Sequence, residues 1–358
     1  MLNYFLNKIF YALLTLFGVV TVIFFLFTIL PGDPAKMMLG QNQTAEQVEA
    51  VKKKYGFDKS LGTQYLYYLN DILPISFHSN NTDDYTYLRS NKYNATELFT
   101  IGNTTTVLKT PYLRESFTKQ GKKVTEVIGE TIPNTFVLAV SAIVIAIILG
   151  IIFGIISALY KDTWIDKTIQ ILSTFGMSVP SFFSAILFAW LFGFVLHEYT
   201  NLEMTGSLYE LDDFGEKMTI QWKNLILPAI VLGIRPLAVV IQLMRNSLLE
   251  VLNQDYIRTA RAKGLSEFQV IKNHAVKNAL NPVVTAISGW FASMLAGAVF
   301  VEYIFGWNGL GKEIVNALNT LDLPVIMGSV LVIAIVFITI NILVDVIYAW
   351  LDPRVKLS

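Results

Sequence analysis

Long apolar runs separated by shorter polar stretches dominate the pattern of this chain. Six of these runs are long enough to cross a hydrocarbon layer of about 30 Å as helices. They lie near residues 9–30, 134–159, 169–196, 225–245, 282–301 and 325–350. This pattern predicts an all-α polytopic membrane protein with six transmembrane helices.

The polar stretches predict how the chain is divided. We expect four parts, in chain order: an anchor helix, a polar region, a helical core with a polar coupling segment over 250–280, and a short tail. Their expected ranges are 1–30, 31–123, 124–351 and 352–358. The first apolar run is too long for a signal-peptide core, and no small-residue cleavage pattern follows it, so we expect a retained anchor.

The polar region begins with helical character over 44–54 and again over 64–69. Residues 78–123 are rich in Asn, Thr, Tyr and Asp and show no clear period. Their tyrosine and leucine side chains can bury area, so we expect an ordered subdomain rather than a random linker.

Composition supports a membrane protein, because 54% of the residues are hydrophobic and only 15% are charged. The net charge of zero indicates no particular partner. The chain has no cysteine, which excludes disulfides and thiolate metal sites. The three histidines share no ligand spacing, and no arrangement typical of catalysis stands out, so we expect no metal site and no enzyme activity.

Lysine and arginine in the short loops predict the orientation, since cytoplasmic loops carry the excess of these residues. With the N-terminus inside, the cytoplasmic side holds five basic residues between Arg258 and Lys277, together with Lys8, Lys161, Lys167, Arg354 and Lys356. The short external loops hold only Lys217, Lys223 and Lys312. Both termini are therefore expected in the cytoplasm and residues 31–123 outside it.

A short basic segment between two apolar runs, which we call the elbow, is the most informative part of the chain. It consists of Asp255, Tyr256, Ile257, Arg258, Thr259, Ala260, Arg261, Ala262, Lys263, Gly264 and Leu265. Small side chains allow another backbone to approach closely, while the cations offer charge at the edge. Gly264 is expected to break the helix, and Ser266 opens a new one with a capping-box spacing. The segment is either a solvated basic loop or a helix–Gly–helix elbow displayed to a cytoplasmic partner.

The elbow, continuing to His274, Asn278 and Pro282, resembles the coupling-loop signature of ABC importer permeases. It is most similar to the oligopeptide/dipeptide/nickel permease branch, B-type subunit. The broader importer motif opens with Glu-Ala-Ala, where this chain has Arg258, Thr259 and Ala260. The subfamily form is intact although the general form is degenerate.

Other motifs of the same branch follow in the right order. These are Leu30-Pro-Gly-Asp-Pro34, Tyr55-Gly-Phe-Asp58, Gln64-Tyr65, Ser178-Val-Pro-Ser-Phe182, Arg245-Asn-Ser-Leu-Leu-Glu250, Glu302-Tyr-Ile-Phe305, Gly309-Leu-Gly311, Asp345 and Asp352-Pro-Arg354. The family's Gly-Asp-Leu-Gly-x-Ser stretch is replaced by Asp71-Ile-Leu-Pro-Ile-Ser76. An apparent insertion over about 77–123 then departs from the family, and its role is open between partner docking and a tolerated surface loop.

The resemblance implies a type I ABC importer transmembrane domain in a bacterial or archaeal cell membrane. Its partners would be a second homologous permease, two cytoplasmic ATPases, an external substrate-binding protein and the lipid bilayer, but no nucleic acid. ATP and Mg would be bound by the ATPases, with no cofactor in this chain. Peptides are the expected cargo, with nickel or a metal chelate as the alternative.

Intramembrane features suggest a substrate pathway. Pro180, within Ser178-Val-Pro-Ser-Phe182, predicts a kink in the third apolar run. Arg235 lies near the middle of the fourth run, where a guanidinium is costly unless it faces a cavity or a partner. It is either a pathway cation or part of a structural ion pair. Asp345 is expected to pair with a nearby arginine or to reach water at the cytoplasmic end.

Residues Gly306-Trp-Asn-Gly-Leu-Gly-Lys312 match the skeleton of a phosphate loop. Glu313 follows where such a loop needs Ser or Thr for Mg²⁺, and an apolar helix precedes the segment. We interpret it as a glycine-rich turn at the end of the fifth helix.

Two other classes of function remain open. A gradient-driven secondary transporter would have ionisable residues clustered at the midplane and inverted repeats, whereas only Arg235 is clearly central. A membrane-anchored scaffold or receptor would need neither kinked prolines nor a small-residue elbow.

Overall fold

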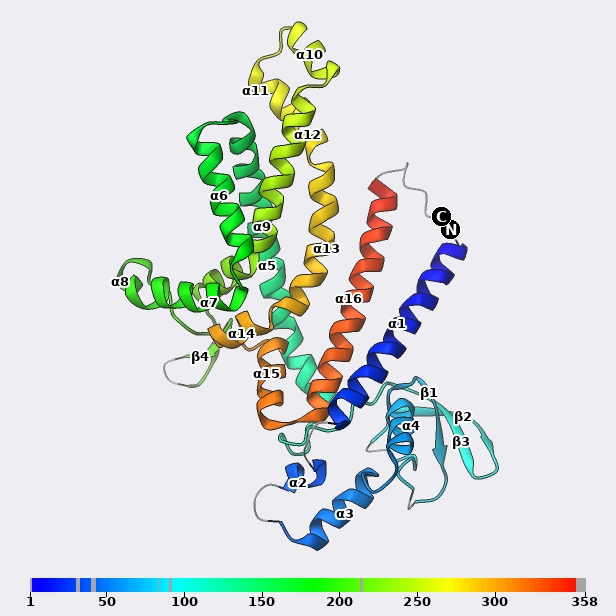
Figure 1. Ribbon diagram of the computed structural model, residues 1–358. Helices are drawn as coiled ribbons and strands as arrows, with labels where there is room; N and C mark the ends of the chain where they lie inside the picture. Colours follow the sequence, from blue (N-terminus) through cyan, green and yellow to red (C-terminus); the bar gives the residue numbers. More distant parts are fainter. Residues whose placement is uncertain are drawn as a thin grey trace. The chain divides into compact units, whose positions relative to one another are not determined.

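The structure, a computed structural model, describes residues 2–29, 33–39, 43–82, 84–89, 92–212 and 215–351. The expected predominantly helical fold is confirmed (Figure 1). The motif residues Leu30–Gly32 and the tail 352–358, with Arg354 and Lys356, lie outside the described residues.

The helices, including two short π-helical segments, are α1 (Leu2–Ile29), α2 (Pro34–Leu39), α3 (Ala45–Tyr55), α4 (Leu61–Ile72), α5 (Val124–Leu159), α6 (Trp164–Ser178), α7 (Ser181–Trp190), η1 (Leu191–Val195), α8 (His197–Thr200), α9 (Lys223–Leu252), α10 (Asp255–Ala262), α11 (Glu267–Val270), η2 (Ile271–Ala275), α12 (Val276–Ala279), α13 (Asn281–Gly297), α14 (Val299–Phe305), α15 (Leu310–Thr320) and α16 (Leu323–Leu351). The strands are β1 (Ile75–Ser79), β2 (Ala95–Ile101), β3 (Thr104–Lys109), β4 (Tyr209–Leu211) and β5 (Met218–Ile220).

The chain divides into two compact units. Unit 1 comprises Met1–Phe10, Thr131–Glu313 and Ile335–Ser358. Unit 2 comprises Tyr11–Glu130 and Ile314–Ala334.

Four single helices are long and apolar enough to cross a membrane: Leu6–Thr28, Val124–Leu159, Lys223–Leu252 and Leu323–Val346. The other two predicted spans are bent pairs. Trp164–Ser178 and Ser181–Val195 meet at 110°, and Asn281–Leu295 and Val299–Phe305 meet at 57°. The described residues therefore hold up to six spans, if each bent pair crosses as one.

The third span is bent far more sharply than the predicted kink. Val179 and Pro180 both have extended backbone, with ψ of 132° and 139°. Proline disfavours helical geometry in the residue before it and donates no backbone hydrogen bond. The helix therefore ends at Ser178 and a new one begins at Ser181. By contrast, α5 continues through Pro133 and begins ten residues earlier than expected.

An ion pair and two apolar clusters stabilise unit 1. Lys8 pairs with Asp345, so the predicted partner of Asp345 is a lysine rather than an arginine. One cluster packs α5, α7, α9 and α14 around the buried Trp307 and Phe305. The second packs α9, α10, α12 and α13 around Met244 and Leu248, directly behind the elbow.

In unit 2, the segment without a clear period forms an antiparallel sheet of order β1-β3-β2. Its inner face holds the buried side chains of Ser76, His78 and Lys109, whereas Phe77 and Phe99 are exposed on the outer face. The buried face is therefore largely polar. β2 is exposed on both faces beyond Ala95, and β3 begins with three threonines, so neither strand shows the apolar/polar alternation by which a strand is predicted.

The inner face is organised around Asp71, which is fully buried. Its carboxylate accepts hydrogen bonds from the hydroxyls of Tyr85 and Tyr93, at 2.7 and 2.8 Å, and from Nε of Arg114 at 3.0 Å. Nζ of Lys92 lies 3.7 Å away. Burial opposes ionisation, but the charges of Arg114 and Lys92 and the tyrosine donors outweigh it, so the pKa of Asp71 lies below its ordinary value.

Replacing Asp71 with Asn should destabilise the sheet by about 3–5 kcal/mol, because the surrounding buried cations lose their counter-charge. The lowered pKa means that the stabilising charge is fully present above the ordinary value of 3.8 and is lost as pH falls through the folded-state value. Hydrogen exchange of β3 amides, corrected for intrinsic rates, should show lower protection in Asp71→Asn at about pH 5 and a smaller further loss at about pH 2. Equal protection in both proteins at the higher pH would contradict this role.

Candidate functional site

The elbow projects beyond the ends of α9 and α13 in unit 1, where Figure 1 shows α10 and α11 as a short helical projection. The predicted break occurs at Gly264, whose φ is +80°. Ser266 and Gln269 form the predicted capping box at the start of α11. The expected helix–Gly–helix geometry is therefore present.

The inner side of the elbow is apolar and buried. Ile257 is fully buried and Ala260 is 6% exposed. They belong to one cluster with Met244 and Leu248 of α9, and with Val270, Ala275, Ala279 and Val283 of the returning chain. This packing fixes the elbow on the helices that carry it.

The outer side of the elbow is polar and open. Tyr256 is 43% exposed, and its hydroxyl accepts a hydrogen bond from Nδ2 of Asn278 at 3.0 Å. The side chain of Arg258 is 74% exposed and lies 3.5 Å from Asp255. Asp255, Thr259, Ala262, Lys263 and Gly264 are also exposed, and Leu265 is half-buried.

Arg261 differs from the other cations of the elbow. Its guanidinium donates to both carboxylate oxygens of Glu267, at 2.8 and 3.2 Å. This bidentate pair connects α10 to α11 across Gly264. Arg261 therefore connects the two helices, although its side chain is exposed like those of Arg258 and Lys263.

Sequence reasoning missed Phe268, which follows the capping Ser266 and is 71% exposed. The Lys272 ammonium lies 5.8 Å from the centre of this ring. An exposed aromatic ring next to the elbow is a candidate contact for a partner. The available signal was an aromatic residue in the first turn of a capped helix, on a loop expected to be cytoplasmic.

Of the three pathway candidates, Arg235 lines a cavity, whereas Ser178 and Pro180 do not. Arg235 is exposed and lines a cavity of about 170 Å³ together with Val179, Ser181 and Trp290. Ser178 and Pro180 flank this lining without joining it, and the Ser178 hydroxyl donates to the carbonyl of Thr174 at 2.9 Å. Within the described residues, Arg235 makes no ion pair.

A buried ion pair that the sequence did not reveal lies between α6 and α9. The guanidinium of Arg245 donates to both oxygens of Asp166 at 2.7 Å, and the Ser157 hydroxyl donates to the same carboxylate at 2.5 Å. Asp166 is 3% exposed. Arg245 lies on the last turns of α9 before the elbow, so this pair ties the base of the elbow to α6.

In the segment that resembles a phosphate loop, backbone N–H groups bind a carboxylate of the preceding helix. Oε2 of the buried Glu302 accepts from the backbone N–H groups of Gly311 and Lys312 at 2.6 and 3.3 Å. The Lys312 ammonium donates to the carbonyl of Gly306 at 2.9 Å. A Cβ at Gly309 would lie only 2.4 Å from the Glu302 carboxylate, so the glycine is required for this closure. The interpretation as a turn ending the fifth helix is confirmed, since Gly306 caps α14 in the left-handed conformation.

No group of three or more His, Asp or Glu side chains among the described residues could hold a metal ion. His78 is instead hydrogen-bonded to Ser76 and to the carbonyl of Thr86, at 2.9 and 2.8 Å.

Comparisons with known proteins match almost the whole chain. A family model described as the binding-protein-dependent transport system inner membrane component matches residues 150–357, and the corresponding N-terminal membrane component matches residues 1–86. The dipeptide transport system permease protein of Alkalihalophilus pseudofirmus is 32% identical over 99% of this chain and 100% of its own length. The glutathione transport system permease protein of Pectobacterium atrosepticum is 32% identical over 99% of each chain. A chain of the inward-facing methionine ABC transporter MetNI has a similar fold, with a TM-score of 0.50 at 14% identity, covering 63% of this chain and 96% of that one.

Proposed function

Since the chain belongs to the family of binding-protein-dependent transport system inner membrane components, the permease subunits of ABC importers, we propose that it forms half of a peptide pathway and receives ATP energy through its elbow. The family makes it a multi-pass membrane subunit without enzyme activity that works with other ABC transporter components.

The geometry of the elbow carries this proposal. Its outer side is polar, built of small residues and exposed, while its inner side is buried against α9 and the returning chain. A surface that is open to a partner and rigidly attached to long helices can transmit a push from that partner to the helices. The proposed contacts are Tyr256, Arg258, Lys263 and Phe268.

The proposed partners follow from this role. Two cytoplasmic ATPases, which bind ATP and Mg, receive the elbow and its counterpart on a second, homologous permease. An external binding protein delivers the cargo. This chain supplies no cofactor.

Peptides are the proposed cargo because the relatives at 32% identity are named for dipeptide and glutathione transport. Nickel or a metal chelate is the alternative from the sequence resemblance. Arg235 is the proposed pathway cation, together with Ser178 and Pro180 at the sharp bend. Its side chain is exposed and lines a largely apolar cavity, so it can contact cargo or a carboxylate of the second permease.

The proposed orientation has both termini in the cytoplasm and residues 31–123 outside. The outer face of the sheet in this region supports a docking role for the insertion over about 77–123. Ile75, Phe77, Phe99, Ile101 and Leu108 are each at least 50% exposed on β1, β2 and β3. An exposed apolar face of this kind marks an interaction surface, and the external binding protein is the partner we propose for it.

Single-cysteine labelling tests the orientation, and the absence of native cysteine makes the experiment clean. A membrane-impermeant maleimide applied to intact cells should label Thr96→Cys and should label Lys263→Cys only after lysis. Both positions are exposed in this chain, and the lysed membranes are stripped of ATPase subunits before labelling, so a lack of labelling in intact cells reports location rather than burial or docking. Labelling of position 263 in intact cells would reverse the topology.

Charged substitutions test the docking role of the sheet. Phe77→Asp with Phe99→Asp should weaken association of the binding protein by about tenfold or more and leave basal ATPase activity unchanged, since a charge in a buried apolar interface is costly. Leu211→Asp, on an exposed residue of the separate β4–β5 hairpin, is the matched control. Deletion of residues 80–120 with a Gly/Ser bridge also removes the partners of the buried Asp71, so it tests whether the segment is structural, whereas the double variant tests docking. Unchanged uptake at limiting substrate would reduce the segment to a tolerated loop, and loss of assembly would make it structural.

A substitution at Gly264 tests the elbow. A Cβ at this position would meet nothing within 4 Å, so the expected cost is not overpacking but the left-handed φ of +80°. Leu should cost about 1–2 kcal/mol there and favour a different break geometry, while Asn, which tolerates this conformation, should cost less. Reconstituted complexes with Gly264→Leu should hydrolyse ATP but transport several-fold less, and Gly264→Asn should lie between.

Gly121→Leu is the matched control, because Gly121 has a φ of +73° and the same open surroundings in unit 2. It introduces the same local strain away from the elbow and should leave coupling intact. Wild-type transport by Gly264→Leu would remove the coupling role.

A further inference from the structure

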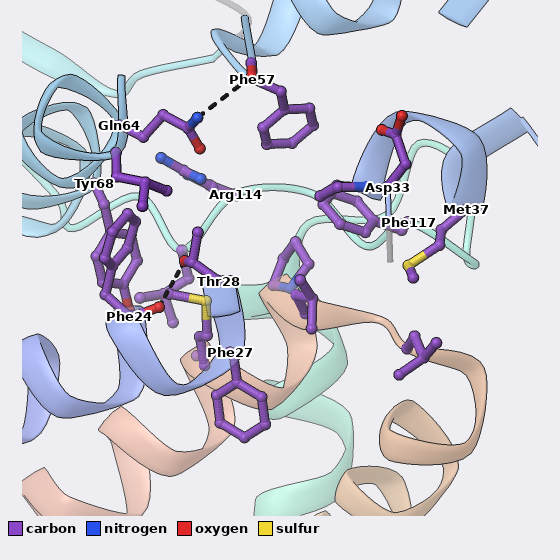
Figure 2. Close-up of a pocket in the computed structure, with 18 of the residues that line it drawn as sticks. Phe24, Phe27, Thr28, Asp33, Met37, Phe57, Gln64, Tyr68, Arg114 and Phe117 are labelled. Carbon is purple, nitrogen blue, oxygen red and sulfur yellow. Dashed lines mark hydrogen bonds between the residues drawn. The ribbon is translucent and has the colours of Figure 1, made fainter. Parts of the chain in front are cut away.

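A cavity of about 360 Å³ lies entirely within unit 2 and includes neither elbow nor pathway residues (Figure 2). Its volume is within the ~300–1,000 Å³ of typical ligand sites. Figure 2 shows Phe24, Gln64 and Tyr68 on one side of it and Asp33, Met37 and Phe117 on the other, with Arg114 between them. Nothing in the proposed function uses it.

One wall of the cavity is apolar and belongs to two candidate membrane spans. Phe24, Phe27 and Thr28 lie at the end of the span Leu6–Thr28. Leu323, Pro324 and Met327 lie at the beginning of the span Leu323–Val346. The ends of spans lie where the acyl chains of a bilayer meet the headgroups. The cavity is therefore placed at the depth of a lipid headgroup region.

A second wall of the cavity presents a guanidinium with free hydrogen-bonding capacity. Nε of Arg114 donates to Asp71, but its two terminal amino groups make no hydrogen bond to any described residue. The rings of Tyr68 and Tyr85 lie 5.3 and 5.9 Å from the guanidinium carbon and hold its plane. Arg114 also has a φ of +69°, a conformation that is strained for a non-glycine residue. The fold therefore fixes this side chain at a local cost.

The other polar groups of the wall are already used. The Gln64 amide donates to the carbonyls of Phe57 and Lys59, at 3.3 and 2.8 Å. Lys52 pairs with Asp33 at 2.6 Å. The hydroxyl of Tyr68 is buried without a partner in the described part of the chain. The unsatisfied groups of this wall are thus the cationic amino groups of Arg114, which only donate, and the Tyr68 hydroxyl, which can donate.

We propose that this cavity binds an anionic phospholipid, with the phosphate on the terminal amino groups of Arg114 and an acyl chain along Phe24, Phe27 and Met327. A guanidinium fork fits a phosphate in bidentate geometry. A small soluble anion would leave the apolar wall uncovered, and a zwitterionic lipid would add a second cation beside Arg114. The combination of walls therefore selects an anionic headgroup joined to an apolar chain.

Native mass spectrometry of the detergent-purified full-length chain tests this binding with three probes. Phosphatidylglycerol should remain bound with an apparent affinity about tenfold above that of phosphatidylcholine with the same acyl chains. Glycerol 3-phosphate, which has the phosphate without the chains, should not displace it. Equal affinity for the two lipids would overturn the proposal. Displacement by glycerol 3-phosphate would make the cavity a site for soluble anions and would also overturn it.

Two variants with matched controls locate the site. Thr28→Phe adds a ring to the apolar wall and should remove most bound phosphatidylglycerol. Thr15→Phe is its control, because Thr15 and Thr28 each donate to the carbonyl four residues earlier in α1, but Thr15 does not line the cavity. Arg114→Lys keeps the charge beside Asp71 but loses the fork, and should weaken binding several-fold. Its control is Arg89→Lys, on an exposed arginine of the same unit.

If Thr28→Phe and Arg114→Lys bind phosphatidylglycerol as tightly as their controls, the lipid binds elsewhere and the proposal fails. Should Arg114→Lys unfold unit 2, Thr28→Phe alone decides the outcome, since it leaves the Asp71 cluster unchanged.

Discussion

The burial of one side of the elbow is the interaction on which the proposed coupling depends. Ile257 and Ala260 pack into the same cluster as Met244 and Leu248 of α9 and Val283 of α13. Without this packing, an exposed basic loop would move independently of the helices beneath it. With it, displacement of the outer side displaces α9 and α13 as well, because tightly packed interiors transmit strain rather than absorb it.

Two further contacts extend this rigidity. The Arg261–Glu267 pair bridges the break at Gly264 and so restrains the angle between α10 and α11. The Arg245–Asp166 pair ties the end of α9 to the beginning of α6, the helix that stops at the Pro180 bend. The elbow, α9 and the bend beside Arg235 therefore form one connected path in unit 1. This path consists of contacts in space. Whether a push on the elbow changes transport through this path is what the Gly264 variants measure.

Much of this architecture could be predicted from the sequence, because its signals are local. Apolar run length predicted the spans, Pro180 predicted the bend, and Gly264 with Ser266 predicted the elbow. The angle of the bend could not be predicted, because it depends on how the two halves of the span pack against neighbouring helices. The sheet of unit 2 was missed because β2 and β3 show no apolar/polar alternation, and because its buried face is held by the polar cluster around Asp71, Lys109 and His78 rather than by an apolar stripe. The internal roles of Arg261 and Glu302 depend on partners that only the folded chain brings together.

Cross-linking from single cysteines in the assembled, transporting complex tests the central claim most directly. Cysteines at Arg258 and Phe268 should cross-link to the co-purified ATPase subunits through a short bifunctional reagent. A cysteine at Tyr199, which is 86% exposed in another part of unit 1, should not. The account predicts ATPase adducts from both elbow positions and none from position 199. A complex that hydrolyses ATP and transports substrate, yet gives no ATPase adduct from either elbow position, would contradict it.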